Sequence, residues 1–198
     1  MIGVLDYGMG NIHSIVKALR RFDPEVVFTK DPDLLSHARA LVLPGDGAFC
    51  AAMEGLSSSG LGDFLCQWAQ KDRPLLGICI GFQVLFEDST EDAPEGTAGL
   101  ALLPGKVRRF SFSKSTRVPH MGWNRLIDQQ GSIRDYMYFV HSYYATEVPA
   151  RIVEYFCNYD TVTFPAAVRQ GRLLAYQFHP EKSGARGLEL LQNWVENL

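Results

Sequence analysis

A cysteine between two glycines is the residue of this sequence best suited to act as a nucleophile. Cys79 lies in Gly-Ile-Cys-Ile-Gly, with Gly77 and Gly81 two residues to either side, where an apolar segment (residues 74–78) meets a helical pattern (residues 82–87). A strand that turns this tightly into a helix needs neighbours without side chains, and the turn exposes the central side chain at the strand's carboxyl end. The helix N–H groups then face the sulfur and favour the nucleophilic thiolate.

The local pattern leaves a second interpretation open. Free cysteines are most often buried packing residues, and glycines between a strand and a helix are also ordinary turn residues. By itself, therefore, the segment around Cys79 is compatible with catalysis and with packing.

A second group of reactive side chains follows another apolar segment (residues 173–178). His179 and Glu181 are separated by Pro180, which interrupts regular strand pairing and lets the carboxylate turn back onto the imidazole. A thiol nucleophile needs a base, and the base needs an acceptor that fixes its tautomer. A lone histidine is usually a core or surface residue, but together with Cys79 the pattern predicts a Cys-His-Glu triad.

Alternating short strands and helices would position these residues. Strands are expected at residues 1–6, 25–29, 40–43 and 74–78, and helices at residues 12–22, 31–36, 48–56 and 60–70. This order predicts an α/β fold with three layers, αβα, around a mostly parallel, flavodoxin-like sheet. Ligands bind outside the carboxyl ends of such strands, which brings Gly45 and Gly47 beside Cys79.

The second half of the chain changes character. Short β segments are expected near residues 106–110, 136–140, 152–155 and 166–170, followed by a strand at 173–178 and a helix at 184–198. Residues 111–116 are polar and predict a hairpin loop. These segments predict an antiparallel β extension of the sheet, and without repeats or a linker we expect a single domain, residues 1–198.

Composition excludes several classes of protein. The chain has 198 residues, of which 46% are hydrophobic and 21% charged, with a net charge of −3, so we expect a packed core and no nucleic-acid partner. No secretory signal or membrane span is visible. One loose group of basic residues is interpreted as the solvated face of a hairpin, or alternatively as a partner surface: Lys106, Arg108, Arg109, Lys114 and Arg117.

The cysteines point to a reducing compartment. Cys50, Cys66, Cys79 and Cys157 form no Cys-x-x-Cys pair, which argues against a zinc site and a disulfide framework. We therefore expect a cytoplasmic protein without metal or organic cofactor, in which the three cysteines other than Cys79 are core residues.

Taken together, the cysteine turn and His179-Pro180-Glu181 resemble the class I, or triad, glutamine amidotransferases. Four further segments make the resemblance finer and extend it over essentially the whole chain: Asp-Tyr-Gly-Met-Gly-Asn at residues 6–11, Met-Gly-Trp-Asn at 121–124, His-Ser-Tyr-Tyr at 141–144 and His-Pro-Glu-Lys-Ser at 179–183. They are similar to the glutaminase subunits of imidazole glycerol phosphate synthases, which belong to histidine biosynthesis.

The resemblance implies a role for each matching residue. Cys79 would attack the side-chain amide of glutamine and form a γ-glutamyl thioester, while His179 would protonate the leaving ammonia and later activate water. Glu181 would orient His179. The oxyanion would be held by the N–H of Ile80 and by one N–H from Gly45, Asp46 or Gly47. Four residues match the family's glutamine-binding positions: Gln83, His141, Ser142 and Tyr143. Alternatively, Gln83 is a helix-surface amide and residues 141–143 belong to an ordinary edge strand.

Asp46 departs from the family, which usually has a small apolar residue at this position. A charge pointing inward would oppose the developing oxyanion. Alternatively Asp46 caps the following helix with its carboxylate outward. Glycines on both sides still permit the backbone rearrangement that the oxyanion site is thought to require.

The resemblance also implies a partner. Ammonia would pass through the interior of a (β/α)8-barrel cyclase subunit, with which the chain would form a heterodimer, and Cys79 would be weakly active until the cyclase carries its ligand. The docking face would lie around Cys79; its candidates are residues 7–11 including Asn11, with Trp123, Tyr136, Tyr138 and Lys182. For Trp123 and Tyr138, core packing is the alternative.

Three other functions compete with this one. The chain could be the glutaminase of a different synthase, in pyridoxal phosphate or purine synthesis, although residues 121–124 and Lys182-Ser183 argue against that. It could be a standalone hydrolase of γ-glutamyl bonds, which would need no partner. It could also be a non-enzymatic module in which Cys79 senses oxidation.

Overall fold

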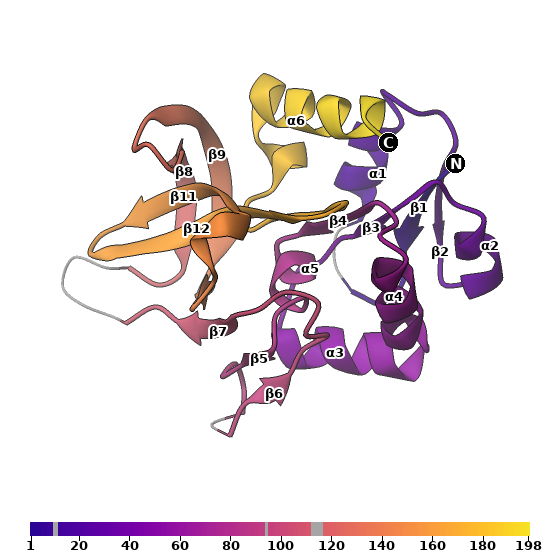
Figure 1. Cartoon of the computed structure of the whole chain (residues 1–198), viewed down its shortest axis with the longest axis horizontal. Helices are drawn as coiled ribbons and strands as arrows, with labels where there is room; N and C mark the ends of the chain where they lie inside the picture. Colours follow the sequence, from indigo (N-terminus) through magenta and orange to yellow (C-terminus); the bar gives the residue numbers. More distant parts are fainter. Residues whose placement is uncertain (10–11, 94, 112–116) are drawn as a thin grey trace.

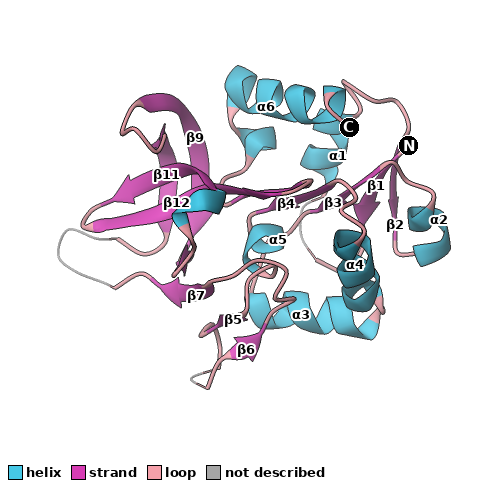
Figure 2. Cartoon of the chain, viewed as in Figure 1, coloured by secondary structure: helices cyan, strands magenta, loops and turns pink. Residues whose placement is uncertain are grey.

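A nine-stranded sheet forms the centre of the computed structural model, which describes residues 1–9, 12–93, 95–111 and 117–198. The strand order is β2-β1-β3-β4-β13-β12-β11-β8-β9 (Figures 1 and 2). The first five are parallel: β1 (Ile2–Leu5), β2 (Val26–Thr29), β3 (Ala40–Leu43), β4 (Leu75–Ile78) and β13 (Leu173–Tyr176). This is the flavodoxin-like order, and it confirms the predicted α/β fold.

Helices cover both faces of the parallel strands. Figure 1 shows α1 (His13–Leu19) and α6 (Gly184–Glu196) on one face, and α3 (Phe49–Ser58) and α4 (Leu61–Gln70) on the other. Alternate strand residues face the two layers: in β13, Leu173 and Ala175 pack toward α3 and α4, whereas Leu174 and Tyr176 pack toward α1 and α6. The short α2 (Pro32–Ser36) begins after Asp31, whose carboxylate accepts from the N–H of Asp33.

The other four strands of the large sheet form the predicted antiparallel extension. They are β12 (Val162–Gln170), β11 (Val153–Tyr159), β8 (His120–Ile127) and β9 (Ile133–His141), and a short 3-10 turn, η1 (Ala150–Ile152), precedes β11. The sequence does not predict strand β8, because Gly122 and Asn124 are poor strand formers and only two of its eight residues are buried. Its pairing with β9 along its whole length decides its conformation.

A second, four-stranded sheet has the order β10-β7-β5-β6. Its strands are β10 (Tyr143–Thr146), β7 (Lys106–Arg109), β5 (Asp88–Ser89) and β6 (Thr97–Ala98). The predicted hairpin after residue 110 is wrong in its pairing, because β7 pairs with β10 and not with the strand that follows it. Residues 112–116, including Lys114, lie outside the described residues. Two members of the basic cluster form ion pairs, Lys106 with Glu147 at 3.0 Å and Arg108 with Asp88.

The helix predicted at residues 82–87 is also wrong in its bounds. The helix here is α5 (Ile80–Gln83), a single turn. The carbonyl oxygens of the next four residues, Val84 to Glu87, accept hydrogen bonds from N–H groups of residues 99–103. Because these acceptors are taken by another segment, the helix cannot continue. The helix N–H groups that were expected to face the Cys79 sulfur therefore belong to a single turn.

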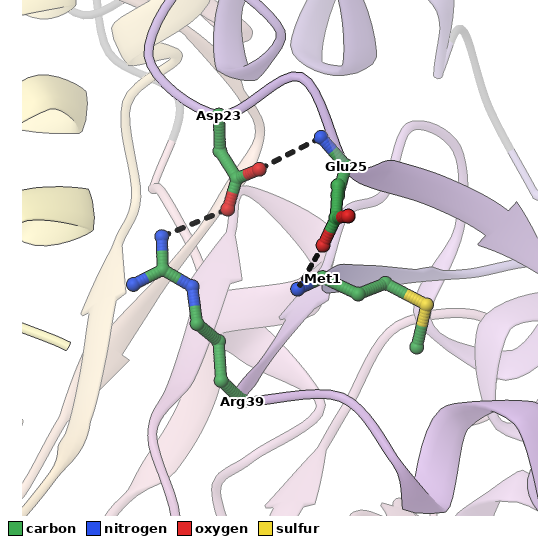
Figure 3. Close-up of polar contacts among 4 residues, drawn as sticks. All are labelled: Met1, Asp23, Glu25 and Arg39. Carbon is green, nitrogen blue, oxygen red and sulfur yellow. Dashed lines mark hydrogen bonds and ion pairs between the residues drawn. The ribbon is translucent and has the colours of Figure 1, made fainter.

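The amino ends of the first strands are joined by a compact polar network (Figure 3). The Met1 ammonium contacts the Glu25 carboxylate at 3.2 Å, and the Arg39 guanidinium donates to Asp23 at 2.8 Å. Asp23 also accepts from the N–H of Glu25 at 2.7 Å. The Asp23, Glu25 and Arg39 contacts fix the segments that enter β2 and β3 relative to the first strand.

Two of the cysteine predictions need correction. Cys157 is buried as expected, but Cys50 and Cys66 are only half-buried, and all four thiols are free. The Cys50 sulfur lies 2.9 Å from Thr97 Oγ1, at the contact between α3 and the small sheet. Among the described residues, no helix is long and apolar enough to cross a membrane.

Candidate active site

The turn after β4 holds Cys79 in a conformation that few residues other than glycine adopt. Its φ is 55° and its ψ −106°, which costs about 1–3 kcal/mol in an ordinary backbone. Close packing explains the glycines: a Cβ on Gly81 would lie 1.9 Å from the Leu43 carbonyl oxygen, and one on Gly77 would lie 2.7 Å from the Gly81 oxygen. Sterics at the ends of β3 and β4 therefore require the Gly-x-Cys-x-Gly spacing.

The segment after β13 brings His179 and Glu181 together. The Glu181 Oε1 atom lies 2.8 Å from Nδ1 of His179, and both side chains are about 95% buried. Residues Pro180–Lys182 form one 3-10 turn, η2, which returns the carboxylate toward the ring. The His179 N–H donates to the Tyr138 carbonyl at 3.0 Å, so the turn is fixed to β9. Since a carboxylate only accepts, Nδ1 carries a proton and Nε2 is the atom free to act on another group.

Cys79 and His179 are electrostatically coupled. Burial lowers the pKa of His179, but the Cys79 sulfur and the Glu181 carboxylate more than offset burial and raise this pKa to about 10. The buried Nε2 of His179 has no well-aligned hydrogen-bond partner among the described residues. An imidazole placed between a carboxylate and a cysteine sulfur is the arrangement of a cysteine nucleophile with its base and orienting acid.

The loop after β3 packs directly against this turn. A Cβ on Gly45 would lie 2.7 Å from the Ile80 Cβ and 3.0 Å from the Gly81 nitrogen. Ile80 is the first residue of α5, so no residue of the helix can accept its N–H. Gly47 has a φ of +117°, which favours glycine, and it is exposed together with Asp46. The loop thus brings main-chain groups close to the cysteine, while Asp46 is exposed to solvent.

Asp46 does not cap the following helix, contrary to one of the two interpretations. The N-cap residue of α3 is Ala48, which makes no side-chain cap bond. Instead Glu91, from the distant small-sheet region, accepts from the N–H of Phe49 at 2.9 Å. Burial raises the pKa of Glu91, and this hydrogen bond counteracts the rise. A long-range partner of this kind leaves no signal in the local sequence.

Gln83 lies on the same side of α5 as the cysteine and is 98% buried. Its N–H donates to the Cys79 carbonyl, and its side-chain Nε2 donates to the Tyr143 carbonyl at 2.9 Å and to Gln177 Oε1 at 3.0 Å. Gln83 is therefore an interior amide rather than a helix-surface one. Residues 141–143 join β9 to β10, which are edge strands of the two sheets.

Three polar residues near the site make contacts that the sequence did not predict. Ser183 Oγ donates to the His179 carbonyl at 2.6 Å and accepts from the Tyr138 N–H at 2.9 Å, which fixes the turn that carries Glu181. Tyr7 is buried, and its hydroxyl donates to the Pro44 carbonyl, so it packs inside instead of serving a docking face. Burial and the nearby Cys79 both raise the pKa of Tyr7. His120 connects His141 to Asn124.

The remaining predicted residues lie on or beside an exposed apolar patch on β8 and β9. Trp123 and Tyr136 are more than half exposed, as is Met121, which was not among the residues predicted for the docking face. Tyr138 is half-buried and stacks edge-on against its cross-strand neighbour Trp123, with ring centroids 6.3 Å apart. Lys182 is half-buried in η2. Asn11 lies outside the described residues.

A small pocket adjoins the candidate side chains, and its lining includes Gly45, Asp46, Ile78, His179, Glu181 and Lys182. A much larger cleft, about 990 Å³, lies at the opposite edge of the sheet, where Pro74 and Arg172 precede β4 and β13. None of the residues that line the small pocket also lines this cleft. The volume of a cleft therefore does not identify the candidate active site. Within the described part of the chain, no group of histidine, cysteine or acidic residues could hold a metal ion.

Comparison with known proteins identifies the family. The sequence profile described as "Glutamine amidotransferase class-I" matches residues 3–198. This chain belongs to that family. Among curated class I amidotransferases, it is 44% identical to "Imidazole glycerol phosphate synthase subunit HisH" of Shouchella clausii, over 98% of this chain and 97% of the relative. It is 45% identical to the protein of the same name from Geobacillus kaustophilus, over 98% and 96%.

Solved structures agree with this fold. "Crystal structure of glutamine amidotransferase" superposes with a TM-score of 0.74 at 21% identity and covers 100% of this chain and 99% of that one. "Structure of PurLQS from Thermotoga maritima" gives 0.70 at 17% identity, over 99% and 97%. At such identities these structures show a shared amidotransferase architecture and nothing finer.

Proposed function

We propose that this chain is the glutaminase subunit of an imidazole glycerol phosphate synthase in histidine biosynthesis. The observation that carries the proposal is the set of buried side chains of Cys79, His179 and Glu181 at the carboxyl edge of β4 and β13. The chain that holds them is 44% identical, over nearly its full length, to a relative named as a subunit of imidazole glycerol phosphate synthase. Its free thiols suit a reducing compartment, and we propose the cytoplasm as its location.

The reaction would proceed in two steps. The Cys79 sulfur attacks the side-chain carbonyl carbon of glutamine, and the oxygen of the tetrahedral intermediate accepts from the Ile80 N–H and a second N–H of residues 45–47. The His179 imidazolium passes its proton to the amide nitrogen, the C–N bond breaks, and ammonia leaves a γ-glutamyl thioester. His179 then takes a proton from water, the hydroxide attacks the thioester, and glutamate and the free thiol are released.

The ammonia needs a protected route to its acceptor. We propose a (β/α)8-barrel cyclase subunit as the partner in a heterodimer, docked over Met121, Trp123 and Tyr136. These large exposed side chains lie on β9, which packs against η2, and on its partner strand β8, and exposed aromatic residues are typical of interface cores. Tyr138 and Lys182, at the inner margin of this patch, would line the contact near the reactive sulfur.

The experiment measures glutamate release from glutamine by the chain alone and with a cyclase subunit plus its ribotide ligand. We expect a low rate alone, a large rise with the liganded cyclase, and loss of both in Cys79→Ala. Cys66→Ala, which removes a half-buried thiol in α4, is the matched control and should leave the rate unchanged. Full activity without the partner would support the standalone hydrolase instead, and no activity under any condition would contradict the triad.

The same assay distinguishes the proposed synthase from the alternative ones. A cyclase barrel should bind this chain and gate its glutaminase activity, whereas the synthase subunits of pyridoxal phosphate or purine synthesis should not. Binding to one of those subunits in preference to the cyclase would overturn the proposed pathway while leaving the glutaminase chemistry in place.

A further inference from the structure

The cleft of about 990 Å³ at the edge of the sheet opposite the candidate active site has the size of a ligand site, since sites for small molecules enclose about 300–1,000 Å³. It is lined by α6, β13, η1 with the start of β11, and the turn between β8 and β9. Figure 1 shows α6 and the β8–β9 hairpin on the same side of β11 and β12. Gln129 Nε2 donates to the Ala150 and Val153 carbonyls at 3.1 and 2.7 Å, and Arg186 donates to Asp135 at 2.6 Å. These contacts fix η1 and α6 to the hairpin, so the walls of the cleft are held together.

Positive charge is in excess in this cleft. The charged side chains that line it are Arg134, Arg151, Arg169, Arg172, Asp128 and Glu154. The terminal residue, Leu198, lines it as well, so four guanidinium groups face at most three carboxylates. A concave site with this balance attracts anions.

Two of the four arginines are each held by one carboxylate. Arg134 Nε donates to Asp128 Oδ2 at 2.6 Å, and Arg169 Nε donates to Glu154 Oε1. The terminal Nη groups of both arginines make no hydrogen bond within the described residues. A guanidinium that is already oriented by its Nε contact loses less side-chain entropy when its Nη groups bind an anion.

The other two arginines, Arg151 on η1 and Arg172 before β13, have no acidic partner in the part of the chain that the structure describes. The Asp72 carboxylate accepts from the main-chain N–H of Arg172 at 2.9 Å and not from its guanidinium. All N–H groups of these two guanidiniums are therefore available to a ligand. Guanidinium groups bind phosphate oxygens through pairs of parallel N–H groups.

Two buried aromatic side chains in the lining have donors without a partner. Tyr176 and Trp194 are 3% and 7% exposed, and neither the Tyr176 hydroxyl nor Trp194 Nε1 makes a hydrogen bond among the described residues. Trp68, which is also 3% exposed, does donate its Nε1, to the Pro74 carbonyl at 3.0 Å. Burial raises the pKa of Tyr176, so its hydroxyl keeps its proton. Buried polar groups normally have partners, and these two donors therefore indicate a ligand with acceptor atoms.

We propose that this cleft binds a phosphomonoester that carries a heteroaromatic ring, a compound of the size of a mononucleotide. The arginines hold the phosphate, which carries nearly two negative charges and only acceptor oxygens at neutral pH. Inorganic phosphate alone would leave most of the cleft unfilled. The ring packs against Trp194 and accepts from the Tyr176 hydroxyl. The side-chain amides of Gln130 and Asn193 also line the cleft, make no hydrogen bond within the described residues, and offer donors and acceptors to such a ring.

The inference is independent of the proposed glutaminase function, because the cleft shares no lining residue with the pocket beside His179. The cleft also contains none of the three exposed side chains proposed to contact the cyclase, which are Met121, Trp123 and Tyr136. A ligand could therefore occupy it in the free chain and in the heterodimer.

The first test measures, by titration calorimetry, the binding of adenosine monophosphate to the whole wild-type chain. The two halves of this probe are tested separately, as adenosine, which lacks the phosphate, and as ribose 5-phosphate, which lacks the ring. We expect the Kd of adenosine monophosphate to be at least about tenfold lower than that of either half, because both the arginines and the aromatic lining contribute. A Kd equal to that of either half, or no binding at millimolar concentration, would overturn the proposal.

The second test locates the binding site with the two unpaired arginines. Arg151→Gln and Arg172→Gln each remove an exposed guanidinium that has no partner among the described residues, so the fold should be retained. We expect each to raise the Kd of adenosine monophosphate about tenfold, the effect of one charge-assisted contact. Arg21→Gln, which removes an exposed arginine after α1 and outside the cleft, makes the same change in net charge and should leave the Kd unchanged. An unchanged Kd in both cleft variants, or an equal rise in Arg21→Gln, would contradict the proposed site.

The third test removes one buried donor and nothing else. Tyr176→Phe keeps the ring that stacks on Phe178, with centroids 4.8 Å apart, and deletes only the hydroxyl. Because this hydroxyl has no partner among the described residues, we expect the stability to urea to be retained and the Kd of adenosine monophosphate to rise about three- to tenfold. An unchanged Kd would contradict the contact between the ligand and Tyr176, and a loss of stability would show that the hydroxyl serves the fold instead of a ligand.

Discussion

Two groups of buried histidines lie within the same half of the molecule and have opposite properties. His179 follows β13 and contacts a carboxylate and a thiol, and its pKa is raised to about 10. His120 and His141 lie on the paired strands β8 and β9, 2.9 Å apart, and burial lowers their pKa values to about 4 and about 3. All three rings are at least 94% buried.

The difference comes from the partners of the rings. His141 donates from Nδ1 to the Tyr143 carbonyl, so its Nε2 accepts from His120 Nδ1, and His120 Nε2 accepts from the Asn124 amide. Every partner is neutral, and a proton on either acceptor nitrogen would break this chain. His179 has the Glu181 carboxylate at the corresponding position, which stabilises the cation. Burial of a histidine therefore does not decide its role, whereas the charge of its neighbour does.

The largest contrast should appear when the same substitution is made in both groups. His179→Phe removes the proton donor and acceptor of the reaction, so we expect at least about a ten-thousand-fold loss of glutaminase rate with the fold retained. His120→Phe keeps the ring that stacks between Phe139 and Tyr159, and should lower the free energy of unfolding by about 1–3 kcal/mol with a rate within about threefold of wild type.

Glutamate release and chemical denaturation of both variants measure these effects. A comparable loss of rate in His120→Phe would mean that the neutral histidine chain takes part in the reaction, and the contrast between the two groups would then be wrong.

Removing only the charge of Glu181 should make His179 resemble the other two histidines. Glu181→Gln keeps an acceptor near Nδ1 but not the carboxylate, so we expect the pKa of His179 to fall and the glutaminase rate to drop about a hundred- to ten-thousand-fold. The imidazole pKa is read by NMR titration. Glu189→Gln, which changes an exposed carboxylate on α6, is the matched control and should alter neither quantity. A full rate in Glu181→Gln would remove the carboxylate from the mechanism.

The pH dependence of the free energy of unfolding should also distinguish the two groups of histidines. His120 and His141 have folded-state pKa values below the value of about 6.5 expected in the unfolded chain, so the unfolded state binds protons first as the pH falls. Between pH 6.5 and 5 the free energy of unfolding should decrease by about 2 kcal/mol for each of these histidines. His179 has a raised pKa, so its contribution is fully present below pH 6.5 and is lost only as the pH rises above it.

Urea titrations at several pH values measure this slope, and His120→Phe should reduce the decrease by about half. A pH-independent free energy of unfolding over this range in the wild-type chain would contradict the neutral state assigned to both histidines.

Much of the fold could be predicted because its signals are local. The apolar runs of β1, β3 and β4, and the glycines at 77 and 81, record burial on both faces and a turn without room for a Cβ. The errors occur where distant segments supply hydrogen bonds. Residues 99–103 take the carbonyl groups that would have continued α5, β9 makes a strand of residues 120–127, and Glu91 replaces Asp46 as the cap of α3.

Side-chain chemistry and period-2 burial patterns are local, so the sequence alone predicts which residues are candidates for catalysis and which strand ends carry them. The charge and orientation of those residues depend on the folded structure. Whether a buried histidine is cationic depends on a carboxylate or a second imidazole beside it, and whether Gln83 offers oxygen or nitrogen depends on Tyr143 and Gln177, which lie 60 and 94 residues away in the chain. Hydrogen bonds and charges act over a few ångströms in space, so they become defined only when folding brings such residues together.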